Sequence, residues 1–254
     1  MAEPNSLRIF SYNIHKGFAA ANRRYVLPAI KDAVLGVGAD LVFLQEVIGE
    51  NRRHAGRIAD WGERPQCEYL ADRAFPHMAY GRNVIHRVGD HGNAILSRHP
   101  ILSFENHDVS TNRFERRGIL HAVIDQGGGH PLHAVCVHLG LTQAGRSAQV
   151  RQLCEKVIAG IDPAAPVILA GDFNDWSLKA SRDILHHTGI VDAFRSLQGR
   201  EARTFPARLP LLRLDRVYTR HFQIAEARVL NQDPWRRLSD HAALLVDVTL
   251  PPTI

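Results

Sequence analysis

The chain has 254 residues, of which 45% are hydrophobic and 22% are charged, and its formal net charge is +5 with the histidines neutral. This composition is typical of a soluble globular protein that is long enough to bury a sizeable core. It excludes a membrane-spanning protein, because no uninterrupted apolar run approaches the roughly 20 residues that a transmembrane helix needs.

Short strand-like segments recur along the whole chain. They are apolar and often alternating or β-branched, and Gly, Pro, Asn or Asp residues separate them. In chain order they are LRIFSYNI (7–14), DLVFLQEV (40–47), HGNAILS (91–97), GILHAVI (118–124), LHAVCVHL (132–139), PVILAGDF (166–173), LRLDRVYT (212–219) and AALLVDVTL (242–250).

Helical patterns lie between some of these strands. The spacing predicts helices within 25–40, 146–160 and, more weakly, 177–189. In the second of these, Val150, Leu153, Val157 and Ile158 fall on one face, and Gly160 ends the pattern. Strands outnumber helices without alternating strictly with them, which favours packed sheets with helices outside over a doubly wound parallel sheet. We therefore expect a single α/β domain over 1–254, with its core at about 7–249.

Charge and cysteine content narrow the cellular setting and the class of partner. Three cysteines that are far apart and odd in number favour reduced thiols over a disulfide framework or a zinc site. The polar opening MAEPNSL does not resemble a signal peptide, so we expect a cytoplasmic protein. A mildly basic surface suits nucleic acid or an anionic lipid headgroup, although the arginines form separate short clusters. No obligate protein partner is evident.

Polar residues gather where the strand-like segments begin or end. Taken singly, each is explained by a turn or by a satisfied surface group. Together they offer the amide, carboxylate and imidazole groups that a hard cation and a phosphate need, and scattered carboxylates suit Mg²⁺ in particular. These residues are Asn13, His15, Glu46, His138, Asp172, Asn174, Asp215, Asp240 and His241.

Seven motifs carry a resemblance to a known family. NIHKG, LQEV, HGNAILSRHP, VHLG, GDFND, LDRVY and LSDH occur in an order and spacing similar to those of the endonuclease/exonuclease/phosphatase superfamily, from about Leu7 to Val248. The chain looks most like the compact bacterial members. The resemblance implies a four-layer α/β/β/α sandwich of the deoxyribonuclease I-like type, in which two packed, mainly antiparallel sheets are flanked by helices.

The resemblance also implies a role for each matched residue. Glu46 should bind Mg²⁺ or Mn²⁺, with Asn13 helping to hold the ion and Asp240 near the ion or its waters. Asp172 should act as general base, and Asn174 should orient the attacking water. His241, paired with Asp215, and His138 should contact the scissile phosphate. Asp175, next to Asn174, reads as a turn residue.

Two further positions are more ambiguous. Arg117 matches a basic position that touches the substrate phosphate in several members, but a surface salt bridge to Glu115 explains it nearly as well. His15 lies where members vary, so it either tunes substrate preference or only lines the cleft. Gly92 and Asn93 read as structural residues, and Arg98 as a residue that pins a loop.

The sequence leaves several classes of function open. The leading expectation is a nuclease-like phosphodiesterase that uses an activated water. The alternatives are an enzyme acting on a phospholipid headgroup or small phosphoester, and a catalytically silent binding module on the same fold. The residues Arg213 and Leu214 stand where inositol 5-phosphatases carry a Trp-Cys pair, which argues against that branch. Residues 203–215 (RTFPARLPLLRLD) read as a loop and strand packed on the core rather than as a membrane-facing segment.

Overall fold

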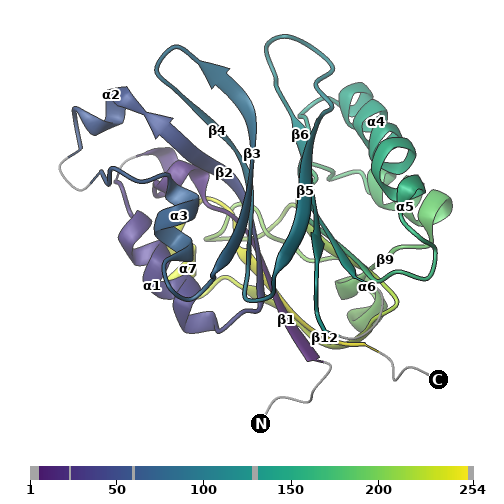
Figure 1. Ribbon diagram of the computed structural model, residues 1–254. Coiled ribbons are helices and arrows are strands. Elements are labelled where there is room, and N and C mark those ends of the chain that lie inside the picture. The colour runs from purple at the N-terminus through teal and green to yellow at the C-terminus, as the bar shows by residue number, and fades with distance from the viewer. Residues whose placement is uncertain (1–5, 23, 59–60, 128–130, 251–254) are drawn as a thin grey trace.

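Two six-stranded sheets pack face to face, and helices cover their outer faces (Figure 1). The computed structural model describes residues 6–22, 24–58, 61–127 and 131–250. The first sheet has the order β11 (Gln223–Leu230), β12 (Ala243–Thr249), β1 (Ser6–Asn13), β2 (Leu41–Asn51), β4 (Gly89–Ser97) and β3 (His77–His86). The second has the order β5 (Ile101–Asp108), β6 (Gly118–Ile124), β7 (Leu132–His138), β8 (Val167–Asp172), β10 (Asp215–Arg220) and β9 (Val191–Asp192).

Neighbouring strands are antiparallel except at two places in the described chain. The parallel pairs are β1 with β2 and β7 with β8. The four-layer sandwich with mainly antiparallel sheets is therefore confirmed. Because β7 and β8 run in the same direction, their carboxyl ends meet at one edge of the sheet, and this brings His138 level with Asp172.

Helices form the two outer layers. On the first sheet lie α1 (Leu27–Val37), α3 (Gln66–Ala71) and α7 (Trp235–Leu238), and on the second lie α4 (Gln143–Gln152) and α5 (Lys179–Thr188). The remaining helical segments are α2 (Arg52–Ala55), α6 (Ala193–Gln198), the π-helical turn Leu153–Val157, and the 3₁₀ turns His15–Gly17, Ala20–Asn22 and Ile158–Gly160. Among the described residues, no helix has the length and apolar character needed to cross a membrane.

Central strands of the sandwich, such as β7 and β8, are apolar on both faces because both faces are covered. In β7, Ala134 and Cys136 face the core between the two sheets, whereas Val135 and Val137 pack under the outer helices. Side chains of a strand alternate between its two faces, so a fully covered strand shows a continuous apolar run. The continuous apolar residues of LHAVCVHL therefore indicate that β7 is buried on both faces.

The predicted helices all form. Glycines in the left-handed conformation end two of them, Gly38 after α1 and Gly189 after α5, each with φ of +67°. The helix predicted within 146–160 is less regular than its apolar pattern indicates. It is an α-helix to Gln152, continues as the π-helical turn and finishes as a 3₁₀ turn at Gly160. Its four predicted face residues are all buried.

Candidate active site

Strand register brings three predicted residues side by side. Asp172 ends β8, and it is level with His138 of β7 on one side and with Asp215 of β10 on the other. The preceding residue, Gly171, has a φ of +143°, and an added Cβ there would lie 2.0 Å from the Val137 carbonyl oxygen. Only glycine fits this close approach of β8 to β7. The glycine of GDFND thus lets the strand carry Asp172 to the edge.

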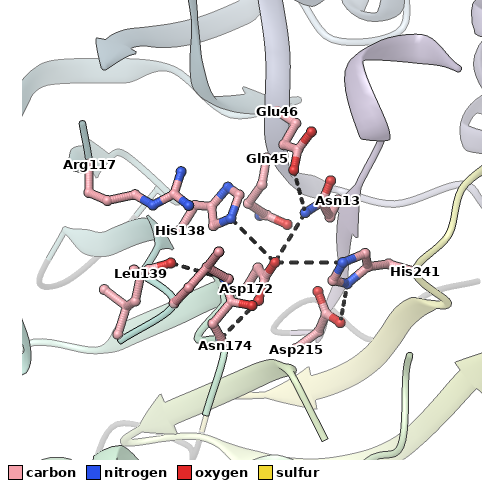
Figure 2. A network of polar contacts seen from close by, with 12 residues as sticks. Asn13, Gln45, Glu46, Arg117, His138, Leu139, Asp172, Asn174, Asp215 and His241 are labelled. Atoms are coloured by element: carbon pink, nitrogen blue, oxygen red, sulfur yellow. Dashed lines mark hydrogen bonds and ion pairs between the residues drawn. The ribbon is translucent and has the colours of Figure 1, made fainter. Parts of the chain in front are cut away.

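Asp172 is the centre of a buried polar network, and its side chain is almost inaccessible (Figure 2). Its Oδ2 accepts a hydrogen bond from Asn13 Nδ2 at 3.1 Å. The same oxygen lies 3.5 Å from His138 Nε2 and 3.7 Å from His241 Nε2. One carboxylate oxygen therefore faces an amide from β1, an imidazole from β7 and an imidazole from the segment before β12.

The protonation of this network follows from burial and from neighbouring charge. Burial raises the pKa of Asp172 to about 6. Burial also lowers the pKa of His138 well below its usual value, and the charge of Arg117 lowers it further. His138 is consequently neutral at pH 7, while Asp172 titrates close to neutrality.

His241 behaves in the opposite way. Its Nδ1 lies 2.8 Å from Asp215 Oδ2, in a hydrogen bond that is itself buried. Burial alone lowers the pKa of this imidazole, but the charges of Asp215 and Asp172 and the hydrogen bond to Asp215 outweigh it and raise the pKa to about 10. His241 is therefore a cation held between two carboxyl groups.

Asn174 is fixed by the loop that follows β7. Its Nδ2 donates to the Leu139 carbonyl at 3.0 Å, and its backbone N–H donates to Asp172 Oδ1 at 2.9 Å. The residue adopts a left-handed φ of +49°, a conformation that asparagine tolerates better than most residues. This turn places the backbone N–H of Asn174 against the Asp172 carboxylate, as Figure 2 shows.

Glu46 lies on the facing sheet at an irregularity of β2. The register with β4 shifts between Leu44 and Val47, and Glu46 takes a left-handed φ of +57°. Bulges of this kind re-aim side chains and are frequent next to active sites. The Glu46 carboxylate is 3.5 Å from Asn13 Nδ2 and 3.7 Å from Lys16 Nζ. Asn13 therefore connects Glu46 to Asp172.

The other predicted residues lie around this centre. Asp240 is beside His15, with 3.9 Å between Asp240 Oδ1 and His15 Nδ1. Arg117 forms the alternative salt bridge to Glu115, at 3.0 Å. Its buried Nε has no hydrogen-bond partner among the residues that the structure describes. The guanidinium therefore keeps one donor for another group.

A family model and a curated relative match nearly the whole chain. The model of the "Endonuclease/Exonuclease/phosphatase family" matches residues 10–241. The chain belongs to this family. A curated relative, "Uncharacterized protein YbhP" of Escherichia coli (strain K12), is 44% identical over 246 residues, which cover 96% of this chain and 97% of that protein. Membership of the endonuclease/exonuclease/phosphatase family indicates phosphoester hydrolysis as the general activity.

Solved structures share the fold at low sequence identity. An endonuclease/exonuclease/phosphatase from Beutenbergia cavernae has a TM-score of 0.75 at 22% identity, covering 97% of this chain and 72% of that one. TDP2 from D. rerio, complexed with single strand DNA product, has a TM-score of 0.73 at 20% identity, with coverages of 96% and 99%. A mannosyl-6-phosphatase from Bacteroides thetaiotaomicron has a TM-score of 0.72 at 18% identity, with coverages of 96% and 100%. At these identities the likeness concerns the endonuclease/exonuclease/phosphatase fold alone.

A divalent cation suits two sets of groups at this family site. Asp172, Asp215 and His241 offer ligand atoms that all lie within 4.8 Å of one another. The Nδ1 of His241 is held by Asp215, and a cation at Nε2 would have to displace the proton that the two carboxyl groups favour. Glu46 offers a carboxylate whose polar contacts are long, and the buried Gln45 Oε1 has no hydrogen-bond partner in the described chain. The Glu46 carboxylate, with the Asn13 side chain beside it, fits a hard cation better.

Sequence reasoning missed two neighbours of Glu46 and misread other positions. Lys16 borders the Glu46 carboxylate, and Gln45 precedes Glu46 in the chain, with its Nε2 3.3 Å from Cys136 Sγ. Their only signal is membership of the NIHKG and LQEV motifs. Asp175 is more than a turn residue: it is buried, and its Oδ2 accepts from the Ala180 backbone N–H at 2.7 Å within the first turn of α5. Residues 203–215 do not pack wholly on the core, because Leu209 and Leu211 are 64% and 57% exposed.

Proposed function

We propose that this chain is an Mg²⁺- or Mn²⁺-dependent phosphoesterase, and specifically a nuclease-like phosphodiesterase. In it a water molecule activated by the protein attacks the phosphorus in line with the leaving oxygen. We take residues 1–254 as one catalytic domain. The main support for this proposal is the position of Asp172, whose Oδ2 lies within 3.7 Å of nitrogen atoms of Asn13, His138 and His241.

Asp172 is our general base. A base works best when its pKa lies near the working pH, and burial raises the pKa of Asp172 to about 6. As it takes the proton of the attacking water, its carboxylate becomes neutral, and the negative charge passes to the phosphoryl oxygens near the His241 cation. Asn174, fixed by the Leu139 carbonyl, orients that water.

His241 and His138 act on the phosphoryl oxygens. Negative charge accumulates on these oxygens in the transition state, and fixed donors stabilise it most where water is excluded. His241 supplies a positively charged donor that Asp215 orients through Nδ1. His138 is neutral and buried, so it serves as a hydrogen-bond donor rather than as an acid.

Glu46, Asn13 and Asp240 are the residues that we assign to the cation. Bound there, Mg²⁺ or Mn²⁺ supplies Lewis-acid stabilisation of the phosphoryl oxygens. Arg117 has a buried and unpartnered Nε beside the network, which supports a contact with a substrate phosphate oxygen. His15, next to Asp240, is placed to border the same substrate.

A nucleic-acid substrate is supported by charge and by one structural neighbour. The chain carries a formal charge of +5, and TDP2 from D. rerio was solved with a single strand DNA product. A second candidate, hydrolysis of a lipid headgroup or small phosphoester, draws support from the exposed Leu209 and Leu211 and from the mannosyl-6-phosphatase neighbour. The silent binding module is disfavoured because the carboxylates and His241 are retained and assembled.

Hydrolysis of a substrate panel tests the proposal. The panel is bis-p-nitrophenyl phosphate, p-nitrophenyl phosphate, plasmid DNA and mixed phospholipid vesicles, each with Mg²⁺, Mn²⁺ or EDTA. We expect metal-dependent cleavage of bis-p-nitrophenyl phosphate and nicking of the plasmid. Activity on lipid or p-nitrophenyl phosphate alone would transfer the assignment to the second candidate. Inactivity throughout would favour the binding module.

A further inference from the structure

A pocket of about 340 Å³ is lined by three arginines. Arg200 and Arg203 come from the chain after α6, and Arg213 from the chain before β10. We call this site the arginine pocket, defined by Arg200, Arg203 and Arg213. Phe194 of α6, Val229 of β11 and Pro210 of the loop before Arg213 add apolar groups to its lining.

The arginine pocket carries an uncompensated positive charge. Within the described residues, none of its three guanidinium groups has a hydrogen-bond or ion-pair partner. The carboxylate in its lining, Glu201, is already engaged by Arg195 at 3.2 Å. By contrast, in the pocket between β3 and β5, Arg116 and Arg117 are paired with Asp108 and Glu115. Unpaired guanidiniums in a concavity are a fitting receptor for an anion.

Short chain segments link the arginine pocket to the catalytic residues. Thr204 follows Arg203, and its Oγ1 accepts from the Asp215 backbone N–H at 3.2 Å. Phe205 comes next, and its ring lies 5.0 Å from that of His241. Arg213 precedes Asp215 by two residues, which limits their Cα separation to roughly 7 Å. The pocket is therefore a near neighbour of the site proposed to hold the scissile phosphate.

We propose that the arginine pocket binds a backbone phosphate of a nucleic-acid strand, away from the phosphate that is hydrolysed. This inference rests on the proposed phosphodiesterase function and specifies its substrate as a strand with several phosphates. Guanidinium groups bind phosphate through paired N–H donors and stay charged at every physiological pH. A nucleic-acid strand carries about one phosphate per 3.4 Å of duplex axis. A strand of only a few nucleotides is therefore long enough to reach from His241 to the pocket.

A lipid surface is a poorer match for this pocket. A phospholipid with a single headgroup phosphate would place that phosphate at Asp172 and His241 and leave the three arginines without a partner. The exposed leucines Leu209 and Leu211 do not line the pocket, although Pro210 between them does. The three unpaired arginines of the pocket therefore favour a second phosphate on the same molecule.

Binding of DNA in the absence of turnover tests the arginine pocket. A fluorescein-labelled 12-nucleotide single strand is titrated in EDTA, followed by anisotropy at several salt concentrations. The test protein carries Arg200→Ala, Arg203→Ala and Arg213→Ala. The control carries Arg73→Ala, Arg151→Ala and Arg182→Ala, which removes the same charge from exposed positions elsewhere.

We expect the pocket variant to raise the Kd about tenfold or more over the control variant. The magnitude of its slope of log K against log salt should fall by about 0.7, because one single-strand phosphate contact contributes about that much. Equal Kd and slope in the two triple variants would overturn the proposal. So would failure of the unmodified protein to bind the strand, or a selective loss of binding to phosphatidylglycerol vesicles in place of DNA.

Kinetics separate this inference from the proposed function. The ratio of kcat/KM for the labelled strand to that for bis-p-nitrophenyl phosphate should fall at least tenfold in the pocket variant. An unchanged ratio counts against the pocket. Absence of hydrolysis on every substrate would refute the catalytic proposal, while the anisotropy measurement would still decide whether the arginines bind the strand.

Discussion

His241 donates its Nδ1 hydrogen to Asp215 across 2.8 Å, and both side chains are buried. The other nitrogen, Nε2, is 3.7 Å from Asp172. The imidazole thus has a carboxyl group on each side, and the pair of charges keeps it protonated far above its ordinary pKa. Substitution of either carboxylate should change the pH range over which the enzyme works.

Asp215→Asn should lower the upper pH limit of activity. In the unmodified protein His241 has a pKa of about 10 and stays protonated up to that pH. Loss of the Asp215 charge lowers this pKa, so the active protonated form disappears at lower pH. The alkaline limb of kcat/KM for bis-p-nitrophenyl phosphate should therefore move downward. Asp247→Asn, which affects only the distant pair with Arg8, is the control, and an unmoved limb would refute the role of the pair.

Asp172→Ala should abolish activity while leaving the fold intact. A general base contributes about 10²–10⁴-fold to the rate, and the variant also removes the acceptor of Asn13. Burial of this carboxylate is unfavourable in itself, so we expect no large loss of stability. Turnover of bis-p-nitrophenyl phosphate and a guanidinium unfolding curve measure the two effects. Turnover near that of the unmodified protein, with Mg²⁺ present, would contradict the assignment.

Glu46→Gln should weaken the affinity for the metal on which activity depends. The substitution keeps the shape of the side chain but removes the charge that attracts a divalent cation. We expect the Mg²⁺ titration of activity to shift to higher concentration, on the order of tenfold. Glu50→Gln is a matched control because Glu50 is exposed further along β2. An equal shift in both variants would show that only the surface charge matters.

His121→Gln should make the protein more resistant to acid. His121 Nε2 and His133 Nδ1 are 2.9 Å apart on β6 and β7, and burial together with the neighbouring imidazole lowers the pKa of His121 to about 4. The unfolded chain therefore binds more protons than the folded one between pH 6.5 and pH 4. Stability is full above pH 6.5 and falls as the pH drops through this window.

The measurement is guanidinium unfolding at pH 7.5, 6.0 and 5.0. His121→Gln should lose less stability from pH 7.5 to 5.0 than the unmodified protein. The control is His186→Gln, at an exposed position of α5. A drop in stability that is the same in all three proteins would mean that other groups cause the acid sensitivity.

Elements buried on both faces could be predicted from the sequence, whereas exposed ones could not. The apolar runs that became β1, β7 and β8 were recognisable because both of their faces are covered. β5 lacked such a signal because it is an edge strand whose residues are exposed or half-buried. β11 is an edge strand of the other sheet, and its burial is similarly incomplete.

The same contrast holds for the candidate site. Its motif residues could be named from order and spacing, and those at Asp172 do converge. The charged state of His241 follows from the pairing with Asp215 that the resemblance implies. The neutral state of His138 could not be predicted, because it depends on burial and on Arg117, both set by the folded structure. The expectation that Gly92 and Asn93 are structural fits the contacts. Asn93 Nδ2 donates to the Gly118 and Cys136 carbonyls, and a Cβ on Gly92 would meet the Gly81 carbonyl oxygen at 1.8 Å.

Glu46 and Asn174 both stand in left-handed backbone, with φ of +57° and +49°. For an ordinary residue that conformation costs about 1–2 kcal/mol. Glycine would adopt it freely, although its greater freedom in the unfolded chain offsets part of the gain. Selection for thermal stability alone would thus favour Glu46→Gly. The selected variants would be more stable but would lack the proposed cation ligand.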